Sequence, residues 1–274
     1  MTLKKTPIDI ETTGNIVCFK LPTTTEVLEQ SRQQDEETPR LNGLVGKLAA
    51  EFLGTCLFVF VGSLSGLGTN KTNGIMHAAV AHGFTIFVLA SSFGGVSGGH
   101  FNPAVSLSVC MAGKLDALLL MPYVIAQLLG GCVGALLVVV VTTEEQYHNI
   151  LGGATMPGGN LWYQNVIVET MLTIALCNTV IMCAADTDTN MLAPLCIGFT
   201  VALDIVAAGS ITGASMNPAR SLGPGLVATI FLPSKDTKEI WQEHYIYWAG
   251  PIIGATLAAF FYRCFFASDK RLVE

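Results

Sequence analysis

The sequence predicts an all-α membrane protein, with six transmembrane helices and two re-entrant half-helices arranged as an inverted repeat. Hydrophobic residues make up 51% of the 274 residues and charged residues 12%, whereas roughly a quarter of an average soluble domain is charged. Six apolar stretches are long enough to cross a bilayer, and one short motif occurs twice. The low charge excludes most soluble enzymes. The net charge of −6 leaves no basic face for nucleic acid.

The six apolar stretches have the length that a hydrocarbon core of about 30 Å requires, about 17 to 25 residues. They lie near residues 44–66, 75–96, 118–141, 161–184, 193–210 and 245–266. An even number of spans places both termini on one side. We expect a flexible cytoplasmic tail over residues 1–40, a membrane domain over 41–268 with halves at about 44–141 and 161–266, and a cytoplasmic C-terminal tail over 269–274.

The lysines and arginines outside the spans predict the orientation, because cytoplasmic loops near the membrane are enriched in them. With the termini inside, the inner side holds Lys4, Lys5, Lys20, Arg32, Arg40, Lys47, Lys114, Arg263, Lys270 and Arg271. The outer side then holds only Lys71, Lys235 and Lys238. Both termini are therefore expected to be cytoplasmic. Arg220 belongs to neither group, and a cation at membrane depth is a functional candidate by default.

An eleven-residue segment occurs twice in the chain. Residues 97–107 and 212–222 are identical at six positions, at an offset of 115 residues. Glu51 and Glu169 also occupy corresponding positions in the two halves, because they lie 51 and 48 residues before the Asn of the respective segment. Each half holds three spans, which is an odd number, so the halves have opposite orientations in the membrane. This inverted repeat is typical of channels and transporters with a central site.

Each repeated segment contains Asn-Pro-Ala followed by roughly ten apolar residues, too few to cross the bilayer. The motif residues are Asn102, Pro103, Ala104, Asn217, Pro218 and Ala219. Asn is a favoured N-cap and Pro a favoured first helical residue, so each Asn should begin a half-helix. The two N-termini, each carrying about half a positive charge, then meet near the midplane. We expect each Asn amide to point into a water-filled lumen as a donor. Such an arrangement orients water through its oxygen and repels cations.

These paired motifs make the chain similar to the aquaporin (major intrinsic protein) family over roughly residues 44–268. The resemblance implies a right-handed bundle of six helices and two half-helices, with one pore per subunit in a homotetramer. Aligning the chain around each motif places the family's selectivity filter at His82, Ile205, Ala214 and Arg220. Strict water channels of the family typically combine Phe, His and Cys with the Arg. The ring is therefore expected to be wider here, and more apolar at Ile205.

Such a filter resembles that of the aquaporin-8 type and of the plant tonoplast aquaporins. This implies that water, ammonia and hydrogen peroxide pass. Residues 98–107, 121–131 and 247–251 also look closest to the aquaporin-8 type. Ser215 is a departure, because mammalian members are expected to carry Cys there, which puts mercury sensitivity at this position in doubt.

The resemblance implies a passive channel for water and small neutral solutes that excludes protons and ions, and not an enzyme. Ser97 and His100 share a loop but supply no convincing nucleophile and base. One alternative is a glycerol or urea facilitator, although Ser221 stands where glycerol facilitators typically carry Asp. Another is a structural membrane-junction protein with minor water flux.

Four charged or titratable residues have alternative interpretations. Arg220 could pair with Asp204 as a structural bridge instead of lining a pore. We expect Glu51 and Glu169 to hold the re-entrant loops by accepting backbone N–H groups, with a proton relay as the alternative. His82 could line the pore or be a helix-packing imidazole. In the pore, its protonation would add a second cation beside Arg220, so we expect permeability to change across roughly pH 5.5 to 7.5.

No cofactor and no metal site are expected. The eight cysteines lack CxxC spacing and fall mostly in apolar stretches, so we interpret them as small hydrophobic residues. Asn70 begins a glycosylation sequon on the predicted outer side. The expected setting is the lipid bilayer of the plasma membrane, with intracellular membranes as the alternative.

Overall fold

The computed structural model describes residues 9–13, 16–20, 39–68, 74–187 and 190–267. The chain divides into two compact units, residues 1–45 and 46–274. In the first unit, strand β1 (Asp9–Thr13) pairs antiparallel with β2 (Ile16–Lys20). The expectation of a flexible tail over residues 1–40 did not include this hairpin. Its strands are rich in β-branched and aromatic residues, which favour such pairing. Residues 21–38, and the expected tail over 269–274, lie outside the described residues.

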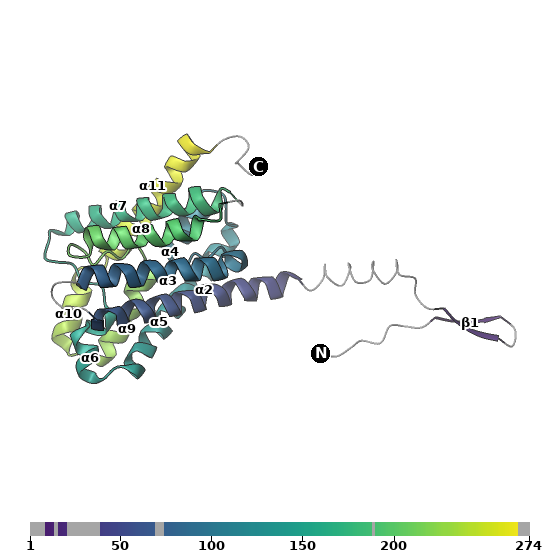
Figure 1. Ribbon diagram of the computed structural model, residues 1–274, viewed down its shortest axis with the longest axis horizontal. Coiled ribbons are helices and arrows are strands. Elements are labelled where there is room, and N and C mark those ends of the chain that lie inside the picture. The colour runs from purple at the N-terminus through teal and green to yellow at the C-terminus, as the bar shows by residue number, and fades with distance from the viewer. Residues whose placement is uncertain (1–8, 14–15, 21–38, 69–73, 188–189, 268–274) are drawn as a thin grey trace. The chain divides into compact units, whose positions relative to one another are not determined.

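The second unit is a bundle of apolar helices (Figure 1). Within the described ranges, five helices are long and apolar enough to cross a membrane once their adjoining turns are included. They contain α2 (Pro39–Leu64), α3 (Gly74–Ser97), α5 (Ala117–Val141), α7 (Trp162–Val180) and α11 (Ile246–Phe261). The sixth expected span is α8 (Ala193–Ala208), which has only 16 residues, about 24 Å at 1.5 Å per residue. It is shorter than expected because the chain turns at Gly209 and enters the second re-entrant loop.

Two half-helices complete the bundle, α4 (Pro103–Met111) and α9 (Pro218–Phe231). Helix α4 packs against α5, α7 and α11, and α9 packs mainly against α5. Short helices α6 (Glu144–Asn149) and α10 (Ser234–Gln242) lie in connections at one end of the bundle (Figure 1). Single turns η1 (Ser65–Gly68), η2 (Leu151–Gly153), η3 (Ile181–Ala185) and η4 (Tyr262–Phe266) flank the longer helices. The all-α fold predicted for the membrane domain is confirmed.

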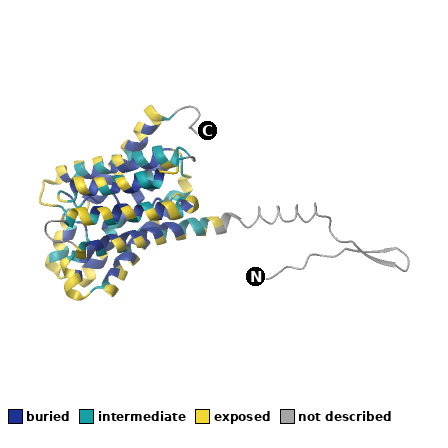
Figure 2. Cartoon of the chain, in the orientation of Figure 1, coloured by how far each residue is buried: buried dark blue, intermediate teal, exposed yellow. Residues whose placement is uncertain are grey.

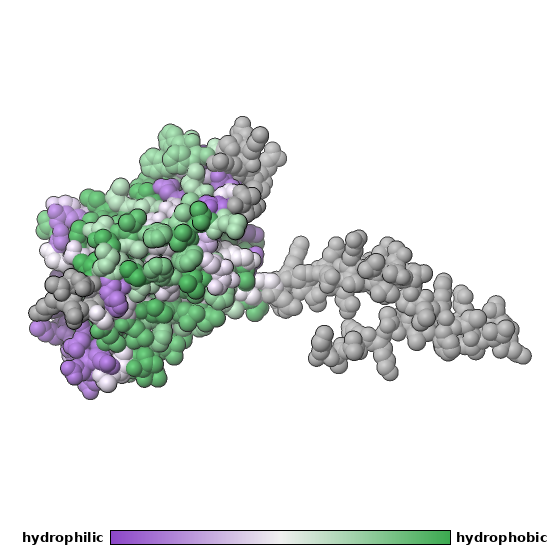
Figure 3. Space-filling view, viewed as in Figure 1, coloured by the Kyte–Doolittle hydropathy of each residue, from purple (hydrophilic) through white to green (hydrophobic). Residues whose placement is uncertain are grey.

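Close helix pairs depend on small residues, as at other membrane helix interfaces. Gly83 of α3 and Gly198 of α8 face each other so closely that a Cβ on either would lie 2.5–2.7 Å from the other's carbonyl oxygen. Buried residues line the inside of the bundle and exposed residues its outside (Figure 2). The exposed face is largely hydrophobic, and hydrophilic residues gather at the end that holds α6 and α10 (Figure 3). This distribution suits a bundle surrounded by lipid.

The candidate pore and its constrictions

The two Asn-Pro-Ala motifs each begin a half-helix with an asparagine cap. Asn102 Oδ1 accepts a hydrogen bond from the Ala104 N–H at 2.9 Å. Asn217 Oδ1 accepts from the N–H groups of Ala219 at 3.0 Å and Arg220 at 3.2 Å. Both asparagines have extended backbone, and a proline follows each at the first helical position. The capping geometry predicted from the sequence is therefore present at both motifs.

The asparagine side chains also tie the two loops to each other. Asn102 Nδ2 donates to the carbonyl of Met216 at 2.9 Å, and Asn217 Nδ2 donates to the carbonyl of Phe101 at 2.9 Å. Both acceptor residues have left-handed backbone, with φ of 48° at Phe101 and 52° at Met216, which is uncommon for side chains of this size. The sequence predicted an amide directed wholly into the lumen. Instead, one N–H of each amide is used between the halves, and the other is left to donate to a solute.

Buried carboxylates hold the backbone of both re-entrant loops. Glu51 Oε1 accepts from the His100 N–H at 3.0 Å, and Oε2 accepts from the Phe101 N–H at 2.7 Å. Glu169 makes the corresponding bonds in the other half, to the N–H groups of Ser215 at 3.0 Å and Met216 at 2.8 Å. Hydroxyl donors add to each set, because Ser97 bonds to Glu51 and Thr212 bonds to Glu169. Each loop is thus fixed in the region just before its asparagine.

A polar network in the first half was not foreseen from the sequence. Gln127 Nε2 donates at 2.8 Å to both Glu51 Oε2 and Ser106 Oγ. Ser106 Oγ in turn lies 3.0 Å from His100 Nδ1. The Ser106 hydroxyl has one hydrogen, and we assign it to Nδ1, which leaves the His100 hydrogen on Nε2. A glutamine in the middle of an apolar helix was the one signal in the sequence for this network.

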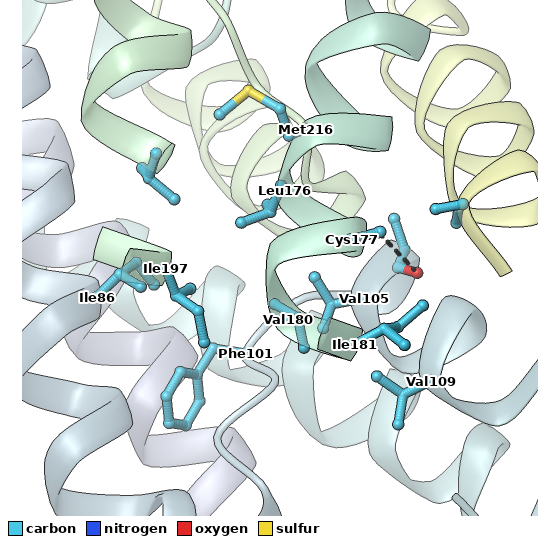
Figure 4. Close-up of a cluster of buried hydrophobic side chains, with 14 of the residues drawn as sticks. Ile86, Phe101, Val105, Val109, Leu176, Cys177, Val180, Ile181, Ile197 and Met216 are labelled. Carbon is cyan, nitrogen blue, oxygen red and sulfur yellow. Dashed lines mark hydrogen bonds between the residues drawn. The ribbon is translucent and has the colours of Figure 1, made fainter. Parts of the chain in front are cut away.

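Two cavities meet at His100. A central cavity of about 30 Å³ is lined by both motif asparagines, and a wide cavity of about 670 Å³ is lined by Lys47, Lys114 and Asn190 among others. His100, Val180 and Ile197 line both cavities. They therefore form a neck between the two. Val180 and Ile197 belong to the buried apolar cluster drawn in Figure 4, which also includes Leu176 and Met216.

Arg220 and His82, two of the four expected filter residues, are in contact. Arg220 Nη2 lies 3.4 Å from His82 Nε2. The other guanidinium nitrogen, Nη1, donates to the Gly153 carbonyl and to Thr155 Oγ1, both at 2.9 Å. Asp204, the alternative partner for Arg220, is not among these contacts in the described part of the chain. Gly153 and Thr155 were not singled out in the sequence, because they lie in a long connection with no regular pattern.

The other two expected filter residues lie in the main apolar cluster. Ile205 is 5% exposed and Ala214 3% exposed, and both belong to the same buried cluster as Phe58. The Phe58 ring meets the His82 ring edge-on, with centroids 5.4 Å apart. Gly62 lies against the His82 ring as well, because a Cβ there would collide with Nε2. Helix α2 therefore sets the position of His82 through residues that the motif alignment did not include.

Other sequence predictions have less structural context. Asn70 lies outside the described residues. Within the described ranges, no group of three or more His, Cys, Asp or Glu could hold a metal ion. The seven described cysteines are free thiols.

Two half-helices that meet end to end inside a bundle of apolar helices define a membrane channel. The family model described as Major intrinsic protein matches residues 40–262. Aquaporin-8 of Notomys alexis is 40% identical over 223 residues, covering 80% of this chain and 82% of that protein. Aquaporin TIP1-2 of Zea mays is 36% identical over 232 residues, covering 81% of this chain and 86% of that protein.

A solved structure agrees with the fold. The X-ray structure of the aquaglyceroporin from Plasmodium falciparum matches with a TM-score of 0.67 and 21% identity, covering 81% of this chain and 96% of that one. The chain belongs to the major intrinsic protein family and is a multi-pass membrane channel of the aquaporin type. The prediction that it is not an enzyme is confirmed by this membership.

Proposed function

We propose that the chain is a passive channel for water and small neutral solutes, including ammonia and hydrogen peroxide, that excludes protons and ions. The observation that carries the proposal is the reciprocal bonding of Asn102 and Asn217 across the two loops. It fixes two amide donors at the point where two half-helix N-termini meet. Both the donors and the helix termini favour a solute that presents a lone pair.

Water passes this point with its oxygen toward the two asparagines. The remaining N–H of each amide donates to that oxygen, so the hydrogens of the water point away along the path. A water held in this way cannot accept a proton from its neighbour and pass it on. The positive ends of α4 and α9 add a barrier to cations. At the neck between the central and the wide cavity, His100 Nε2 presents a third donor.

Solute selectivity is set at the ring of His82, Ile205, Ala214 and Arg220. Arg220 supplies donors and a fixed charge, while Ile205 and Ala214 supply apolar walls. A ring with one apolar side and a small residue opposite is wider than one built from bulky polar groups. It admits ammonia and hydrogen peroxide, which are close to water in size. The permanent charge of Arg220 disfavours ammonium.

A glycerol or urea facilitator is the second candidate, because the aquaglyceroporin from Plasmodium falciparum has the same fold. Ser221 argues against it. Its hydroxyl bonds to Thr155 at 2.9 Å and to Ser215 at 2.6 Å, so it is used in holding the second loop and not in lining a wider path. A membrane-junction protein with minor water flux is the third candidate, and a high water permeability per channel would rule it out.

Assembly and location are part of the same proposal. We infer a homotetramer in the plasma membrane, with both termini in the cytoplasm and Asn70 glycosylated on the outer side. The orientation rests on the distribution of lysine and arginine along the chain. Crosslinking tests the tetramer, protease access tests the side on which each terminus lies, glycosidase treatment tests Asn70, and surface labelling of intact cells tests the plasma membrane.

The test of the solute range is stopped-flow permeability of proteoliposomes to water and ammonia, measured in parallel. Wild type should pass both. Ile205→His narrows the ring and adds a polar group, so it should lose ammonia permeability preferentially. Ile205→Val is the matched control, because it keeps the ring apolar and should keep both permeabilities. Passage of water alone by wild type would remove ammonia from the proposal, and passage of neither would overturn it.

A further inference from the structure

Helices α7 and α8 run antiparallel and contact each other through a ladder of polar side chains. Thr179 Oγ1 on α7 lies 3.1 Å from Thr200 Oγ1 on α8. Cys183 lies four residues after Thr179, and Cys196 lies four residues before Thr200. Both cysteines are therefore about one turn closer than the threonines to the connection between the two helices. This spacing places the two thiols side by side, close enough to interact with each other. Both thiols are free and half-buried.

The two cysteines lie beside the wall of the wide cavity. Cys183 is part of the π-helical turn η3, and its neighbours Ala184 and Ala185 line the cavity. Pro194 and Ile197, on either side of Cys196, line it too. Small oxidants in the cavity therefore come close to the pair. Cys56 and Cys177, by contrast, are buried.

We propose that Cys183 and Cys196 form an oxidant-sensitive dithiol that closes to a reversible disulfide between α7 and α8. In the predicted orientation the wide cavity opens to the cytoplasm, where thiols are kept reduced. The two cysteines are then reduced thiols under ordinary conditions, and they form the disulfide on exposure to hydrogen peroxide. The proposal concerns thiol chemistry and does not depend on which solutes the channel passes.

The reaction with hydrogen peroxide balances without a further reactant. One cysteine thiolate attacks a peroxide oxygen, the O–O bond breaks, and a sulfenic acid forms; the released hydroxide takes up the thiol proton and becomes water. The second thiolate attacks the sulfenic sulfur, the S–S bond forms and the S–O bond breaks. The second hydroxide takes up the remaining thiol proton. One peroxide thus oxidises two thiols to one disulfide and is itself reduced to two waters.

The experiment uses the full-length protein in proteoliposomes, treated with hydrogen peroxide and then with a maleimide that labels the remaining thiols. Mass spectrometry of the digest should show a Cys183–Cys196 linked peptide in wild type. Dithiothreitol should restore maleimide labelling at both positions. Cys183→Ser and Cys196→Ser should lose the linked peptide. Cys264→Ser is the matched control, because Cys264 is exposed, and it should keep the linked peptide.

Two results would overturn the proposal. One is full maleimide labelling of Cys183 and Cys196 after peroxide treatment that oxidises Cys264. The other is a link from either cysteine to a third one in place of the expected pair. Size-exclusion profiles of the serine variants check that they fold. Because the readout is covalent, it is independent of the water and ammonia measurements, and either proposal can fail alone.

Discussion

Arg220 donates a hydrogen bond from Nη2 to Nε2 of His82, across 3.4 Å. On the other side of the ring, His82 Nδ1 lies 2.8 Å from the Ala78 carbonyl. A carbonyl only accepts, so Nδ1 carries the hydrogen and Nε2 accepts from the guanidinium. The contact therefore joins one cation to one neutral ring, and the proposed filter holds a single positive charge.

This geometry predicts a water permeability that does not depend on pH, in place of the change expected from the sequence. A second proton on His82 would break the bond to Arg220 and set two cations against each other. We expect water permeability of proteoliposomes to stay constant from about pH 5.5 to 7.5, the range in which an ordinary histidine titrates. A profile that changes in wild type and is flat in His82→Ala would contradict this.

Gly62 should be as sensitive to substitution as the filter residues themselves. In Gly62→Ala the new Cβ collides with the His82 ring, and moving the ring breaks its contact with Arg220. We expect a several-fold change in the ratio of ammonia to water permeability, measured by stopped flow. Gly46→Ala on the same helix is the control, because nothing lies within 4 Å of a Cβ there. Equal behaviour of the two variants would show that α2 does not set the filter.

The loop carboxylates should matter for stability. In Glu51→Gln one accepting oxygen is replaced by an amide that donates, and it then faces the N–H of His100 or Phe101. A buried donor without an acceptor costs about 1 to 3 kcal/mol, so the thermal unfolding midpoint in detergent should fall. Glu169→Gln should behave alike. Glu144→Gln, on the exposed start of α6, should leave the midpoint unchanged. A midpoint that stays the same in both loop variants would argue for a proton relay instead.

The asparagine donors should control proton exclusion. In Asn217→Asp the carboxylate still caps α9, but it can no longer donate to the Phe101 carbonyl or to a passing water. We expect lower water permeability and a measurable proton leak into vesicles that contain a pH-sensitive dye. Asn149→Asp, exposed at the end of α6, is the matched control and should do neither. An Asn217→Asp channel with no proton leak and an unchanged water permeability would show that the asparagine donors are dispensable.

Much of the architecture could be predicted because it repeats. The two Asn-Pro-Ala motifs share local capping chemistry, so Asn102 and Asn217 were placed at half-helix starts from residue type alone. The contacts that hold Arg220 could not be predicted in the same way. Gly153 and Thr155 come from an irregular connection, and their positions depend on how that connection folds back over the bundle. The hydrogen bonds of Gln127 could not be predicted either, because its partners are 76 and 21 residues away in the sequence.

The length of α8 was also misjudged, for a physical reason. The expected span ran to residue 210, but Gly209 and the turns after it lead the chain into the loop that ends at Asn217. Hydropathy measures only where apolar residues are, and it does not mark where a helix has to stop so that a loop can re-enter.

The bonds from Asn102 to Met216 and from Asn217 to Phe101 mean that neither half of the chain contains a complete pore motif. A chain consisting of one half would leave its asparagine amide without an acceptor. It could satisfy the amide only by pairing with a second copy inserted upside down in the same membrane. A channel made of separate halves would then need one copy inserted in each topology, and a single chain that joins both halves fixes one of each. The two halves, expressed as separate polypeptides, should accordingly assemble only when both are made in the same cell.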